Sequence, residues 1–139
     1  LHMHPHLSVI TLTVYDLDAA FEFYHHGLGL KSQGMIGTEF EYGAVAFFDL
    51  QQGLKLALWP QNSLSHDTGL EKTAFCATQM SLGHNVSSPT EVDQLMQQAI
   101  LAGAKETKPA QPTFYGGYAG YFQDLDGHLW EIVYNLQFN

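Results

Sequence analysis

The segment Met80–Glu91 joins a strand-like run to a strong helix start (MSLGHNVSSPTE). Up to Val86, apolar residues alternate with small or polar ones, which is the period of a strand with one buried face. Ser88 and Glu91 have the spacing of a capping box, in which two side chains bond free backbone N–H groups of the first helical turn. Pro89 suits the first helical position, which needs no N–H donor. The segment therefore predicts a strand that runs directly into a helix.

The rest of the second half follows from this start. A helix is predicted because apolar residues recur every three or four positions: Val92, Leu95, Met96, Ala99 and Ala102. It is predicted to end at Gly103, since glycine is typical of helix ends. Three strand-like runs come next, near Lys105–Gln111, Tyr118–Gln123 and Leu129–Tyr134. The predicted order is β-α-β-β-β.

The first half repeats this order. Val9–Tyr15 alternates as a strand, and Asp16 can cap a helix whose apolar positions run from Leu17 to Leu28. Further strands are predicted near residues 31–36, 44–50 and 54–59. Matching features lie about 70 residues apart, which indicates an internal duplication.

The fold class that follows is α+β, with two βαβββ modules whose helices lie outside a U-shaped open sheet or barrel. We expect one domain over residues 8–139, with module one at about 8–60, a connector at 61–78 and module two at about 79–136. Residues 1–7 read as a disordered or tag-like segment. Its three histidines could also chelate a metal on their own.

Composition limits the partners. The chain has 139 residues, a net charge of −9 and five lysines without any arginine. The basic surface and guanidinium groups that bind nucleic acids and polyphosphates are therefore missing. A single cysteine and the lack of a long apolar run favour a cytoplasmic protein without an internal disulfide or a membrane span.

Strand alternation predicts which side chains point away from the helices. Glu131 is the unusual one, because a carboxylate in an apolar strand needs water, a partner or a ligand. The sheet face with Glu131 reads as a small-molecule pocket or, equally, as a plain sheet face that is merely wet. His84 has the opposite parity and is predicted to be a core histidine. The expected ligand-binding residues on the strands are Thr11, Thr13, Lys55, Trp59, Ser81 and Asn85, with Glu131 as the candidate catalytic residue.

An aromatic segment precedes the last hairpin. Gly116 and Gly117 lie among Tyr115, Tyr118 and Tyr121. This loop is predicted to form a flexible wall that stacks on a planar ligand, or else a bulged hairpin that packs its own aromatic rings.

Three stretches carry a family resemblance: Ser8–Tyr24, Thr113–Phe122 and the ending Asp124–Glu131 (DLDGHLWE). The chain resembles the vicinal oxygen chelate superfamily of glyoxalases, bleomycin resistance proteins and dioxygenases, and Gly83–Val86 resembles one uncharacterised bacterial branch of it. The resemblance implies paired modules around a cavity and often a homodimer. It also implies a divalent metal that holds two adjacent substrate oxygens.

Position by position, the resemblance places the metal ligands at Val9, Ala57, Ser81 and Glu131. Only Glu131 is of a type that binds a divalent metal. We therefore expect no cofactor. A divalent metal bound through Glu131 is the less favoured alternative.

Three functions stay open at this point. The first is a metal-free protein that binds a small, largely apolar molecule. The second is a lyase, isomerase or dioxygenase that uses Glu131 as a base or metal ligand. The third is a dimerisation module with a vestigial cavity.

Overall fold

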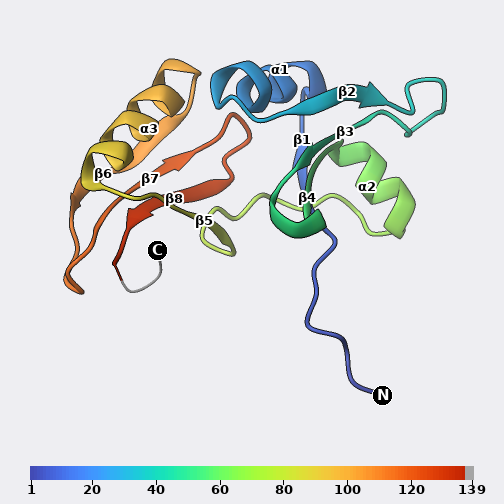
Figure 1. Ribbon diagram of the computed structural model, residues 1–139. Coiled ribbons are helices and arrows are strands. Elements are labelled where there is room, and N and C mark those ends of the chain that lie inside the picture. The colour runs from blue at the N-terminus through green and yellow to red at the C-terminus, as the bar shows by residue number, and fades with distance from the viewer. Residues whose placement is uncertain (137–139) are drawn as a thin grey trace.

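The computed structural model describes residues 1–136, which form two four-stranded sheets. Figure 1 shows how the helices lie beside these sheets. The strands of the first sheet are β1 (Val9–Val14), β2 (Ser32–Ile36), β3 (Val45–Asp49) and β4 (Lys55–Pro60). Those of the second are β5 (Ser81–Asn85), β6 (Lys105–Pro112), β7 (Tyr118–Gln123) and β8 (Leu129–Tyr134). The predicted α+β fold of two βαβββ modules is confirmed.

The two sheets have the same topology. Their orders are β1-β4-β3-β2 and β5-β8-β7-β6. In each, the first strand of the module runs parallel to the last, and the other pairs are antiparallel. No strand of one sheet pairs with a strand of the other among the described residues, so the sheets stay open and do not close into a barrel.

The helices begin at the caps expected from the sequence. Asp16 accepts a hydrogen bond from the N–H of Ala19 at 3.1 Å and starts α1 (Leu17–Glu22). Ser88 accepts one from the N–H of Glu91 at 3.2 Å and starts α3 (Pro89–Leu101). The Glu91 carboxylate closes the capping box on the N–H of Ser87 at 2.6 Å.

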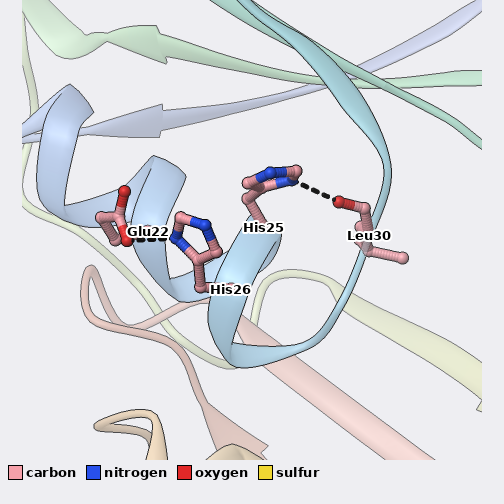
Figure 2. A network of polar contacts seen from close by, with 4 residues as sticks. All are labelled: Glu22, His25, His26 and Leu30. Atoms are coloured by element: carbon pink, nitrogen blue, oxygen red, sulfur yellow. Dashed lines mark hydrogen bonds and ion pairs between the residues drawn. The ribbon is translucent and has the colours of Figure 1, made fainter.

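The first helix continues as a π-helical turn, Phe23–Gly27, that the sequence did not predict. Figure 2 shows how the two histidines of this turn are held. His26 Nδ1 donates to the Glu22 carboxylate at 2.5 Å, and His25 Nδ1 donates to the backbone carbonyl of Leu30 at 2.8 Å. Both imidazoles therefore have structural partners close by in the chain.

The core of module one lies between its sheet and α1. Leu12, Leu56 and Phe48 are at most 1% exposed, and the Phe48 ring packs against Phe21 and Tyr24 of the first helix. The expected helix-facing set of β1 and β4 is therefore the buried one.

A buried polar network joins the two modules. The Tyr24 hydroxyl, from the π-helical turn, donates to Asp124 Oδ2 at 2.5 Å and accepts from Trp130 Nε1 at 3.0 Å. The other Asp124 oxygen accepts from the backbone N–H groups of Asp126 and His128. The carboxylate thus holds the β7–β8 turn and fastens module one to it.

Alkaline pH should weaken this junction. The pKa of Tyr24 is raised well above its ordinary value of 10.0, first by burial and then by the charge and hydrogen bond of Asp124. Above that value the unfolded chain loses a proton that the folded chain keeps, so stability is present below pH 10.0 and falls as the pH rises further. Urea unfolding from about pH 8 to 11 should show this decline, and the Tyr24→Phe variant should lack the part that Tyr24 contributes. An equal decline in both proteins would contradict the assignment.

The predicted connector, residues 61–78, starts with a helix that the sequence did not predict, α2 (Gln61–Thr68). It packs on β4 and β1, and Figure 1 shows it beside these strands and apart from α1. His66 of α2 stacks on Tyr42 with ring centres 4.0 Å apart, and the Tyr42 carbonyl accepts a hydrogen bond from Trp59. Because Trp59 points away from α1, α2 lies against the opposite face of the first sheet.

The outer strand β6 and the N-terminal segment are exposed. β6 is exposed at seven of its eight positions, and its pairing with β7 shifts register twice. Residues 1–8 form no helix or strand and extend away from the sheets (Figure 1). No helix in the described part of the chain is both long and apolar enough to cross a membrane.

Candidate ligand-binding site

The sheet face of module two that points away from α3 holds a carboxylate and a phenol side by side. Glu131 of β8 lies in register with Tyr121 of β7 on one side and with Gly83 of β5 on the other. Partial burial first, and then the charge and hydrogen bonding of Glu131, raise the pKa of Tyr121. Tyr121 therefore keeps its proton at neutral pH and can share it with Glu131.

The surroundings of this pair are apolar on one side and open on the other. Val133 and Ala119, which follow on the same face, are only 7% and 5% exposed. At Gly83 an added Cβ would meet no atom within 4 Å. Glu131 thus lies between an apolar patch and open space.

The aromatic loop contributes to the same face with Tyr115. Tyr115 lies close enough to Tyr121 to contribute to its raised pKa, after burial and Glu131, and Phe114 stands edge-on to Tyr115 at 5.2 Å. Tyr118 points elsewhere, because its hydroxyl donates to Asp93 of α3 at 2.8 Å. Of the three tyrosines predicted to line a ligand, Tyr121 pairs with Glu131, Tyr115 lies near Tyr121, and Tyr118 turns toward Asp93 of α3.

The remaining predicted residues of module two lie along β5. Ser81 is in register with Leu129, and Asn85 is in register with Val133. Both are exposed on the Glu131 face, one position pair to either side of Gly83. His84 has the opposite parity, as expected, but it is exposed. Its predicted place in the core was wrong, because β5 is an edge strand and α3 does not cover it there.

The predicted ligand-binding residues of module one have different surroundings. Thr13 is in register with Trp59, at the end of the sheet where α2 packs. Thr11 is exposed and lies beside Ala57. Lys55 forms an ion pair with Asp49. These residues share one sheet face, but α2 and the ion pair already occupy part of it.

Two of the cavities between the modules combine residues of several strands, and Glu131 lines neither of them. One, of about 290 Å³, combines Thr13 with Cys76, Asp126 and His128. His128 Nε2 donates to the Thr13 carbonyl at 2.8 Å, and the N–H of Tyr15 donates to Asp126 at 2.8 Å. Burial raises the pKa of Asp126. These hydrogen bonds fix the ends of the strands to each other.

The other cavity, of about 340 Å³, has mostly leucine and isoleucine walls. Neither cavity is predicted from the sequence, and Gly83 is not among the predicted site residues. Strand parity alone could have found Gly83, because it is the glycine opposite Glu131. The cavities depend on how the modules meet, for which the sequence carries no local signal.

The metal of the resembled family does not fit the side chains present. Val9 and Ala57 offer no donor atom, and Ala57 is 2% exposed. The Lys55 side chain lies beside Val9 in register, and its positive charge opposes a cation there. No group of three or more His, Cys, Asp or Glu side chains in the described residues could hold a metal ion.

Comparisons with known proteins agree with this architecture. The model of the Glyoxalase/Bleomycin resistance protein/Dioxygenase superfamily matches residues 6–132. A glyoxalase-related enzyme from Fulvimarina pelagi is 36% identical, with a TM-score of 0.82 over 95% of this chain and 89% of that chain. The fosfomycin resistance protein FosX from Listeria monocytogenes is 26% identical, with a TM-score of 0.70 over 97% and 98%.

A glyoxalase/bleomycin resistance protein/dioxygenase family enzyme from Burkholderia phytofirmans is 20% identical and shares the fold, with a TM-score of 0.76 over 93% of this chain and 98% of that one. The search of curated proteins found no match. With a family model that covers most of its length and a relative at 36% identity, the chain belongs to the Glyoxalase/Bleomycin resistance protein/Dioxygenase superfamily.

Proposed function

We propose that this protein binds a small, largely apolar molecule against the Glu131 face of module two, without a metal. The observation that carries the proposal is the Glu131–Tyr121 pair, which lies beside an apolar patch and next to the open space at Gly83. A carboxylate in this position accepts a hydrogen bond from a ligand hydroxyl, amide or amine, and Tyr121 offers a donor. Tyr115 and the exposed Phe114 supply ring surface for stacking.

A second candidate function rests on the same pair. Glu131 can take a proton from a bound substrate while the Tyr121 phenol hydrogen-bonds to an oxygen that gains negative charge. That is the chemistry of an isomerase or lyase, and it needs no metal. The relative FosX is a fosfomycin resistance protein, so a protein similar to this chain is known to act on a small molecule. Dioxygenase chemistry has no support from the donor set.

We further expect a cytoplasmic homodimer, with the exposed sheet faces of the two modules covered by a second copy. If that contact fills the Glu131 face with the partner's own side chains, the protein is a dimerisation module and the face has no ligand. Binding to the dimer separates these cases.

The test uses two substitutions, one that removes the charge of Glu131 and one that fills the space beside it. Glu131→Gln removes the charge, and Gly83→Val fills the space beside it without steric conflict, since an added Cβ meets nothing within 4 Å. A valine in place of glycine in a strand should leave the fold as stable or raise stability by about 0.5–1 kcal/mol. Both variants should lose binding of aromatic amides and alcohols at least about tenfold in ligand-observed NMR.

Glu71→Gln, the same change at an exposed residue of the connector, is the control and should bind like the parent protein. Unchanged binding in Gly83→Val would refute the site. Conversion of a bound compound, lost in Glu131→Gln, would favour the isomerase or lyase over the binding protein.

A further inference from the structure

The apolar cavity of about 340 Å³ lies on the helix side of the sheets, between the modules. Its walls include Ile10 of β1, Leu82 of β5 and Leu95 of α3, all half-buried. Its floor includes Leu56 and Ile132, which are 1% and 2% exposed. The space is therefore continuous with the hydrophobic core and open at one side.

The cavity exists because the junction between the modules is filled at only one end. β1 and β5 are both edge strands, and no hydrogen-bond ladder draws them together. At one end the Tyr24–Asp124–Trp130 network closes the gap. At the other end Leu54, from the β3–β4 turn, and Leu95 of α3 both line the cavity, and both side chains remain partly exposed.

The lining determines which ligand fits. It includes no Asp, Glu or Lys among the described residues, so a charged group inside would lose its water without a partner. Polar side chains stand only at the mouth: Gln51 from module one and His84 from module two, both exposed. Pockets of about 300–1,000 Å³ with apolar walls and few polar groups are typical small-molecule sites.

We propose that this cavity is a second binding site, for an uncharged molecule with an alkyl or aryl body and one hydrogen-bonding group. The body lies against Leu82 and Leu95, and the polar group meets His84 or Gln51. The cavity lies on the sheet face opposite to Glu131, because Leu82 and Ile132 have the opposite parity on β5 and β8, and of the residues assigned to the Glu131 face only Gly83 also lines it. Binding here contacts both modules at once and stabilises their junction.

The uncharged dye N-phenyl-1-naphthylamine, whose fluorescence rises in apolar surroundings, tests the site. It should bind the full chain with one site per protomer in this cavity and raise the unfolding temperature of the protein. Leu95→Trp, which fills the cavity from α3, should weaken binding at least about tenfold. Leu101→Trp is the matched control on the same helix, because Leu101 is 78% exposed and lies outside this cavity. It should bind the dye like the parent protein.

A second variant guards against misfolding. Leu54→Trp fills the same space from module one and should give the same loss of binding while circular dichroism and the unfolding transition remain cooperative. The dye binding that both filled variants lose should persist in Glu131→Gln, because Glu131 does not line this cavity, and this distinguishes the site from the one on the opposite face. The inference is overturned if the parent protein does not bind the dye, if both filled variants bind it normally, or if Glu131→Gln abolishes binding.

Discussion

Replacing Tyr24 with phenylalanine is expected to lower the free energy of unfolding by about 2–3 kcal/mol. The substitution keeps the ring, so packing against Phe48 and Trp130 remains. It removes the hydroxyl that donates to Asp124 and accepts from Trp130, and it leaves a 5% exposed carboxylate short of one partner. A buried charge that loses a donor costs more than a neutral group does. Urea unfolding followed by circular dichroism measures the loss.

Tyr118→Phe is the matched control for this experiment. Its hydroxyl also donates to a carboxylate, Asp93, but that pair is exposed, and water replaces the lost donor. We expect a change below about 1 kcal/mol. Similar losses for the two variants would show that burial of the network between the modules adds nothing to its strength.

Gly27→Ala should be the other strongly destabilising substitution, at about 1–3 kcal/mol. Gly27 ends the π-helical turn of module one, and a Cβ built there would lie 2.5 Å from the Cβ of Ala102, just beyond α3. The two helices would have to separate, and the hydrogen bond from Gln98 to the Gly27 carbonyl, 2.9 Å long, would stretch. Thermal and urea unfolding both report this loss.

The double variant Gly27→Ala with Ala102→Gly isolates the steric cause. It moves the methyl group from one helix to the other, so most of the lost stability should return, apart from up to about 1 kcal/mol for the added glycine. A double variant as unstable as the sum of the single ones would mean that the backbone of the π-helical turn, rather than contact with Ala102, requires glycine.

Local signals explain why the fold could be predicted from the sequence. Ser88 and Glu91 fix where α3 begins, and alternation in β1 and β4 separates the buried leucines from the other face. The helix α2 could not be predicted in the same way. Its residues favour turns, and it is held by contacts with β4 and β1 and by the stacking of His66 on Tyr42, which lies far away in sequence.

The candidate site was predictable only as far as strand parity reaches. Parity places Glu131 and Tyr121 on one face, and the structure has them in register. Tyr118 was expected beside a ligand. Its parity on β7 instead places it on the α3 side of the sheet, where its hydroxyl donates to Asp93. The junction of the modules depends on Tyr24 and Asp124, which are 100 residues apart. No sequence pattern within either segment predicts that contact.

The outer edges of the two sheets also affect the tendency of the protein to aggregate. A free edge strand is a template on which a foreign strand can add, and this is a common first step of aggregation. Pro109 and Pro112 remove N–H donors from β6, and Lys105 and Lys108 place charge along it. β2 is interrupted at Gly34, where φ is +95° and the pairing register shifts. Both outer edges are thus poor templates, and the sheets resist growth into fibrils from either side.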